Sequence, residues 1–159
     1  MKIKNADLFR LQAGLRGVAD LRGVKFAYAC TKNLRRVAAL CDDMRAGLKP
    51  TPAFAAYEKA RMALAKKHAT KDENGETIAE TVGAETRYQI AFPLLFEAEL
   101  DSLTAEHAGA VAAHADAVAE FEALLLESSD VDIYTIAIEL VPDDISAGQL
   151  EMIWEMIAE

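Results

Sequence analysis

Basic residues are almost missing from the second half of this 159-residue chain. Residues 72–159 contain one, Arg87, against twenty-one Asp and Glu. Residues 1–71 hold the other sixteen Lys and Arg but only five acidic residues. The two halves therefore carry formal charges of +11 and −20. Such an imbalance raises two hypotheses, a nucleic-acid partner or two halves that pack against each other.

Long apolar segments are also missing. No run approaches the roughly 20 apolar residues that a membrane-spanning helix needs, so we expect no membrane partner. Two lysines stand within residues 1–5, but no apolar segment follows them, so the sequence predicts no secretory signal. We therefore expect the protein in the cytoplasm of the cell that makes it.

Cysteines and aromatic residues are scarce. Cys30 and Cys41 stand eleven positions apart in a helical pattern. That spacing is about 16 Å at about 1.5 Å per residue, whereas a disulfide needs Cα atoms within about 7 Å. Both cysteines lie on an apolar stripe, which favours buried thiols over nucleophiles, because a nucleophile needs an exposed thiolate beside a base or cation. Aromatics make up only 7% of residues, so we expect a core built by close helix approach.

The sequence does contain long helical periodicity. Apolar residues at alternating steps of three and four over residues 24–48 predict a helix that begins at Val24 and ends at Gly47. Its stripe comprises Ala27, Cys30, Leu34, Val37, Cys41, Met44 and Leu48. Residues 49–52 cannot continue a helix, and Thr51 with Pro52 predicts the cap and first position of a second helix. We therefore expect a kinked pair of basic helices that ends near Thr70.

A longer helix is predicted over residues 93–127. Its stripe keeps steps of four and three throughout, through Phe96, Leu100, Leu103, His107, Ala110, His114, Ala117, Phe121 and Leu124. A repeat of this length favours coiled-coil packing, with the kinked basic pair as partner. The predicted fold class is therefore mainly α, a long antiparallel helical hairpin with small β elements near the termini. We expect a single domain over residues 1–159, made of a basic helical half (1–71) and an acidic half (72–159).

Shorter elements are predicted before residue 24 and around Gly83. Asn5 is expected to cap a first helix, which glycines weaken and which ends near Leu21. Residues 77–79 and the alternating residues 88–92 are expected to pair as strands around Gly83.

The C-terminal segment combines strand and helix signals. Residues 131–140 are rich in β-branched side chains and predict one or two strands, which could pair with residues 2–4. Ser146 and Gln149 predict a capping box at the start of a closing helix. That helix is expected to bury Leu150, Ile153, Trp154 and Ile157 on one face.

His107 and His114 are the first candidates for a site. They lie seven positions apart on one helix face, roughly 10 Å, which is too far for both to bind one metal ion. Packing at a helix seam, or lining a polar gap, is therefore favoured over metal binding, and we predict no metal and no cofactor. The same seam is a candidate homodimer interface, which protonation near pH 6 would weaken. Its residues are His107, Ala110, His114, Ala117 and Phe121.

Catalytic signatures are not found in the sequence. Carboxylate pairs occur at residues 42–43, at residues 143–144 and at Glu97 with Glu99. In so acidic a chain such pairs arise by chance, and we expect all three to be solvated. Nothing resembles a phosphate-binding loop, a nucleophile elbow or a zinc knuckle. We therefore predict that the protein is not an enzyme and has no catalytic residue.

A basic ridge lies away from the apolar stripe of residues 24–48. Its members are Arg22, Lys25, Lys32, Arg35 and Arg36. Nucleic-acid-binding proteins use such ridges to neutralise phosphates. Here only Phe26 and Tyr28 supply aromatic rings nearby, and the acidic half would repel the same backbone. Internal neutralisation by the acidic helix is therefore favoured over nucleic-acid binding.

The order of these signals resembles a family of small phage and prophage proteins of unknown function. The matching segments are residues 1–8, the turn at residues 71–75, residues 88–90, residues 122–136 and residues 145–157. The chain departs from that family at residues 49–52 and in the alanine-rich stretch 104–119. The resemblance implies a phage-encoded product and supplies no catalytic residues.

These observations predict a non-enzymatic phage protein that acts through protein contacts, in assembly or in the virion. We expect it in the cytoplasm of the bacterial host or in the virion, with a phage or host protein as partner. One alternative is an accessory protein that inhibits a host defence protein, with its acidic half mimicking nucleic acid. The other is a nucleic-acid-binding regulator that uses the basic ridge.

Overall fold

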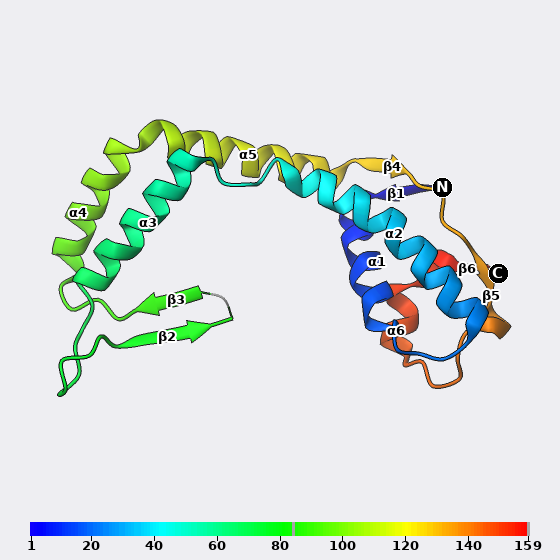
Figure 1. Cartoon of the computed structure of the whole chain (residues 1–159). Coiled ribbons are helices and arrows are strands. Elements are labelled where there is room, and N and C mark those ends of the chain that lie inside the picture. Colours follow the sequence, from blue (N-terminus) through cyan, green and yellow to red (C-terminus); the bar gives the residue numbers. More distant parts are fainter. Residues whose placement is uncertain (84, 159) are drawn as a thin grey trace. The chain divides into compact units, whose positions relative to one another are not determined.

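The computed structural model describes residues 1–83 and 85–158, without the side chains of Val82 and Glu85 (Figure 1). The chain is mainly helical with small strands, which confirms the predicted class. The elements are β1 (Lys2–Lys4), α1 (Asn5–Gly17), α2 (Val24–Ala46), α3 (Pro52–Lys67), β2 (Ala79–Val82), β3 (Glu85–Tyr88), α4 (Pro93–Glu106), α5 (Ala108–Leu126), β4 (Ser128–Asp130), β5 (Ile136–Ala137), the 3-10 helix η1 (Ile138–Leu140), α6 (Ala147–Met152), the 3-10 helix η2 (Trp154–Met156) and β6 (Ile157–Ala158).

The chain forms two compact units. The terminal unit combines Met1–Leu48 with Val118–Glu159, and the middle unit is Lys49–Ala117. The division passes through α5, between Ala117 and Val118. Each unit contains residues of both the basic and the acidic half, so the charge boundary at residue 71 is not the structural boundary.

The apolar core lies in the terminal unit. Helix α1 packs against α2 and α6 there. The buried residues of this core are Ile3, Leu8, Leu11, Leu15, Val18, Phe26, Ala29, Cys30, Val37, Cys41, Val131, Ile136, Ile153 and Met156. Three of them, Cys30, Val37 and Cys41, belong to the stripe predicted for residues 24–48. The prediction was wrong for Ala27, which is exposed, because Phe26 and Ala29 form the buried face at the start of α2.

The predicted interruption after residue 48 is present. Helix α2 ends at Ala46, and α3 begins at Pro52 with Thr51 as its cap. The Thr51 hydroxyl accepts a hydrogen bond from the Phe54 N–H at 3.2 Å. This satisfies one of the free donors at the start of the helix.

Two helix predictions were wrong in detail. Asn5 does not cap α1 but is its first residue, buried, with its amide nitrogen donating to the Leu124 carbonyl at 2.8 Å and its amide oxygen accepting from Ser129 at 2.7 Å. The predicted helix 93–127 is divided into α4 and α5 at His107, whose φ and ψ of −106° and 16° leave the helical region. Gly109, two residues later, weakens helix propagation at this point.

The strand pairing at the termini differs from the prediction. Strand β1 pairs antiparallel with β4, with Ile3 opposite Ser129, and not with residues 131–140. Most of that segment is not a strand; only β5 pairs, in parallel, with β6. The Asn33 side chain of α2 hydrogen-bonds to both main-chain groups of Tyr134, and this contact replaces a strand neighbour.

The C-terminal helix begins as predicted but ends early. Ser146 and Gln149 form the predicted capping box. Helix α6 then ends at Met152 and the 3-10 turn η2 follows. The change of helical pitch buries Met156 and leaves Trp154 half exposed, so the prediction that Trp154 is buried was wrong.

The middle unit consists of α3, α4, the front of α5 and a β-hairpin. Strands β2 and β3 pair antiparallel around Gly83, which has a φ of +65°, so the expected hairpin is present. Its strands lie closer to the turn than the expected residues 77–79 and 88–92, and Phe92 precedes α4 instead of belonging to a strand. Helices α3 and α4 pack antiparallel, because Tyr57 near the start of α3 bonds Thr104 near the end of α4, while Lys67 at the end of α3 bonds Glu99.

Candidate interaction surfaces

The predicted histidine seam has neighbours within the middle unit. The His114 ring stacks on Phe54 with centroids 3.8 Å apart, and the His107 ring lies 5.7 Å from Tyr57. In the terminal unit, Phe121 makes an edge contact with Phe9 at 5.9 Å. Ala110 and Ala117 are half-buried. The proposed use of this seam as a dimer interface stays a prediction.

Helices α4 and α5 are covered only in part. Every residue of the stripe predicted from Phe96 to Leu124 is half-buried, which places the predicted face toward the neighbouring elements. Neither helix has a fully buried residue. Among the described residues of the middle unit, only Tyr57, His68 and Ala69 are buried. The middle unit therefore has very little core.

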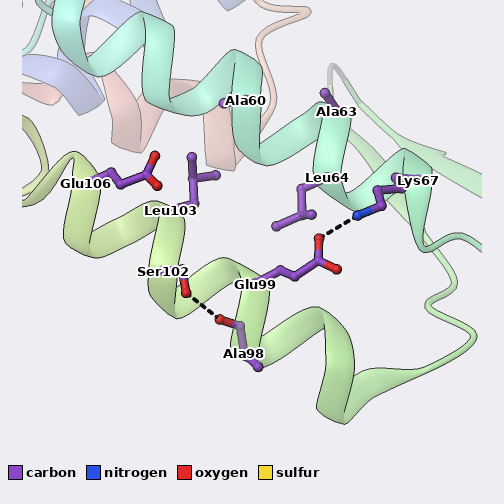
Figure 2. Close-up of a pocket in the computed structure, with 9 residues that line it drawn as sticks. All are labelled: Ala60, Ala63, Leu64, Lys67, Ala98, Glu99, Ser102, Leu103 and Glu106. Atoms are coloured by element: carbon purple, nitrogen blue, oxygen red, sulfur yellow. Dashed lines mark hydrogen bonds and ion pairs between the residues drawn. The ribbon is translucent and has the colours of Figure 1, made fainter.

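A groove of about 680 Å³ runs between α3 and α4 (Figure 2). It is lined by Ala60, Ala63, Leu64, Lys67, Ala98, Glu99, Ser102, Leu103 and Glu106. Figure 2 shows Leu64 and Leu103 pointing into the space between the two helices. The other lining residues near them are small, because three are alanines and one is a serine whose hydroxyl donates to the Ala98 carbonyl at 3.1 Å. The surface is therefore apolar and accessible.

An ion pair closes one end of this groove. Lys67 Nζ lies 2.7 Å from Glu99 Oε2, and Nε2 of the buried His68 lies 3.2 Å from the same oxygen. The hydrogen bond from Lys67, followed by the contact with His68, lowers the pKa of the Glu99 carboxyl. The expectation that Glu97 and Glu99 are both solvated was wrong for Glu99, which is half-buried and paired. No local pattern predicts this pairing, because the partners Lys67 and His68 are 32 and 31 residues away.

Exposed apolar side chains stand at the start of α4. Phe92, Leu94 and Leu95 have exposed fractions of 68%, 84% and 53%. Leu95 precedes Ala98, Ser102 and Glu106 by three, seven and eleven residues, so it lies on the face of α4 that lines the groove. The apolar surface therefore extends beyond the groove toward the beginning of the helix.

The basic ridge is partly engaged within the terminal unit. Arg36 forms an ion pair with Asp132 at 2.8 Å, and the Lys32 ammonium lies 4.3 Å from the centre of the Tyr134 ring. Arg22, Lys25 and Arg35 are exposed. Residues 132–134 thus cover two of the five predicted positions. Tyr134 was not predicted here, because it reaches α2 only through the fold.

A second aromatic ring joins that surface. Tyr28 contacts Tyr134 edge to face, with centroids 5.7 Å apart, and it is 58% exposed. Together with Ala27, Thr31 and the neighbouring cations, Tyr28 lines a shallow groove of about 560 Å³ along α2. The aromatic content of the ridge is therefore higher than its sequence neighbourhood indicates.

The two cysteines lie apart from every groove described above. Both are buried and neither forms a disulfide. Burial raises the pKa of the Cys30 thiol to about 11, and it also raises the pKa of Cys41. A thiol with a raised pKa and no access to solvent is a poor nucleophile.

No three His, Cys, Asp or Glu side chains are placed to hold a metal ion in the described part of the chain. Within residues 1–83 and 85–158, no helix has both the length and the apolar character needed to cross a membrane. Comparisons with family models, curated proteins and solved structures find no match to this chain.

Proposed function

We propose that the chain is a non-enzymatic, phage-encoded protein that acts through protein contacts, as an assembly factor or a component of the virion. The uncovered apolar surface of the middle unit carries this proposal. It comprises the groove between α3 and α4 together with Phe92, Leu94 and Leu95. The phage origin rests on the order of sequence motifs, and it implies action in the bacterial host or in the particle. The longer hairpin that would join α2 to α5 stays a prediction.

The described part of the middle unit lacks the apolar core that would stabilise it alone. Among the described residues of the middle unit only three are buried, so folding gains little from apolar burial there, while it still costs the conformational entropy of ordering the chain. Exposed Leu94 and half-buried Leu103 would be transferred from water if a partner packed on this face. Fully burying an exposed side chain of this size is favourable by roughly 1.5–3 kcal/mol of free energy. A protein partner is therefore the occupant that fits this surface.

Quantitative affinity capture tests the proposal. The tagged chain is expressed in the bacteria during phage production, and captured proteins and purified particles are analysed by mass spectrometry. We expect phage structural proteins to be enriched with the wild type. The groove variant Ala63→Gln/Ala98→Gln should lose them, while Ala112→Gln/Ala115→Gln, at exposed positions of α5, should retain them. Enrichment that is equal for both variants would contradict a role for the groove.

The acidic surface favours a second candidate, inhibition of a host protein that normally binds nucleic acid. The exposed acids of α4 and α5 are Glu97, Asp101, Glu106, Asp116, Glu120 and Glu122. Carboxylates carry the same sign of charge as the phosphates of a nucleic-acid backbone. Capture of a single host protein that DNA displaces would support this candidate. Capture of phage structural proteins that DNA does not displace would exclude it.

A further inference from the structure

Helices α3 and α4, which border the groove, differ in the sign of their charge. Helix α3 contains four basic residues and one acidic residue, so its formal charge is +3. Helix α4 contains four acidic residues and no basic one, so its formal charge is −4. Only the pair Lys67 and Glu99 forms an ion pair between them among the described residues. Lys59 and Lys66 on α3, and Glu97, Asp101 and Glu106 on α4, are exposed and can therefore face an external partner.

We propose that the groove is filled by the α3–α4 hairpin of a second copy of this chain. In the complex a two-fold axis places α3 of each copy against α4 of the other. The inference rests on the proposed function, because it names the partner of the same surface. The result is a four-helix arrangement of two hairpins, a common solution for amphipathic helices that share an apolar seam.

Charge determines which helices meet in this dimer. If α3 packed on α3, +3 would face +3. If α3 packs on α4, a helix of formal charge +3 lies beside one of −4 at both halves of the interface, because a two-fold axis repeats each contact. Opposite charges beside an apolar seam select partner and orientation in helix pairs. The same surface is therefore complementary to itself.

The shape of the groove suits another helix. Helices pack at interaxial distances of about 8–10 Å, and small residues at the contact permit the closer end of this range. Ala63 and Ala98 are exposed on opposite sides of the groove, with Leu64 and Leu103 between them. A helix from a second copy would cover these leucines. It would also reach the exposed Leu95 on the same face of α4.

Sedimentation at several concentrations provides the first test. We expect a concentration-dependent dimer for the wild type, weakened by salt, because exposed charges are screened at high ionic strength. Ala63→Gln/Ala98→Gln fills the groove with longer side chains of similar helix propensity and unchanged charge. It should weaken the dimer by about tenfold or more. The matched variant Ala112→Gln/Ala115→Gln should dimerise as the wild type does.

A charge exchange tests the orientation. Lys59→Glu/Lys66→Glu changes α3 from +3 to −1, and Glu97→Lys/Asp101→Lys/Glu106→Lys changes α4 from −4 to +2. All five positions are exposed, and the bonds of Lys67 with Glu99 and of Arg61 with Glu58 are kept. Each variant alone should remain monomeric because like charges then face each other. An equimolar mixture should form heterodimers, since acidic and basic helices meet again at both contacts.

The outcomes separate this inference from the proposed function. A wild-type monomer at every concentration, or groove and control variants that dimerise equally, would overturn the second copy as occupant. Captured phage proteins would still support the proposed function in that case. Conversely, a groove-dependent dimer without any captured phage protein would retain the inference and contradict the proposed function. If a charge variant loses its helical circular dichroism, the neutral glutamine pair decides the question.

Discussion

The side-chain amide of Asn33 binds the main chain of Tyr134 at both of its polar groups. Asn33 Nδ2 donates to the Tyr134 carbonyl at 2.9 Å, and Oδ1 accepts from the Tyr134 N–H at 2.8 Å. Asn33 is completely buried in the face of α2 that also carries Cys30 and Val37. The Asn33 side chain therefore holds the segment after β4 against α2 by bonding both the N–H and the carbonyl of one residue, as a neighbouring strand would.

We expect Asn33→Ala to lower the free energy of unfolding by about 2–3 kcal/mol, because two hydrogen bonds are lost and the main-chain groups of Tyr134 keep no partner in their place. Urea denaturation followed by circular dichroism measures the change. Asn74→Ala, at an exposed turn position, is the matched control and should change stability by less than about 0.5 kcal/mol. Equal effects of the two substitutions would contradict the role given to Asn33.

Two glycines of α1 should respond in opposite ways to alanine. A Cβ at Gly14 would stand 2.6 Å from Met152 Cβ and 2.8 Å from the Met152 carbonyl oxygen, whereas a Cβ at Gly17 would meet nothing within 4 Å. We expect Gly14→Ala to destabilise the protein by about 1–3 kcal/mol through overpacking against α6. Gly17→Ala should be neutral or stabilising by up to about 1 kcal/mol. Thermal unfolding of both variants tests this, and a stabilising Gly14→Ala would refute the close approach of α6.

The Glu99 carboxylate should contribute to acid unfolding. Its pKa in the folded protein lies below its ordinary value of 4.5, so the folded state binds this proton less tightly than the unfolded chain. The resulting stability is present above that ordinary value and is lost as the pH falls through the folded pKa. We expect Glu99→Gln to flatten the dependence of unfolding free energy on pH in acid. Part of this pH dependence should remain in the variant, because the hydrogen bond from Arg61 also lowers the pKa of the Glu58 carboxyl.

Glu97→Gln is the control for this prediction, since it removes the same charge from an exposed position of α4. Unfolding curves at a series of pH values compare the two variants with the wild type. Lys67→Ala should, in addition, move the carboxyl titration of Glu99, followed by NMR, toward higher pH. An unchanged titration would show that the Lys67 ion pair does not persist in solution.

The thiols should be unreactive while the protein is folded. With a pKa of about 11, about one Cys30 thiol in a thousand is ionised at pH 8, and both cysteines are buried. We expect a disulfide exchange reagent to react only after denaturant is added. Because the folded pKa is raised above 9.0, the stability contributed by the protonated thiol should decline as the pH rises from about 9 to 11. Fast reaction of one thiol in the native protein would contradict its burial.

Helix ends were predictable where a short-range signal decides them. Thr51 with Pro52 and Ser146 with Gln149 cap their helices within three residues, and the structure confirms both. Asn5 has the same capping chemistry, but its partners Leu124 and Ser129 lie 119 and 124 residues away. No local pattern contains that information, so the prediction of its role failed.

In the candidate surfaces, too, some features follow from the local sequence and others only from the tertiary structure. Periodicity alone placed the stripe of α4 and α5 on the correct face, because a helical repeat of 3.6 residues decides which side chains point the same way. The separation of charge between the halves was likewise visible in the sequence. Only the tertiary structure brought Glu99 to Lys67, and Tyr134 to Lys32. These contacts depend on which distant segments pack together, and that is decided by long-range burial and hydrogen bonding, which local periodicity does not encode.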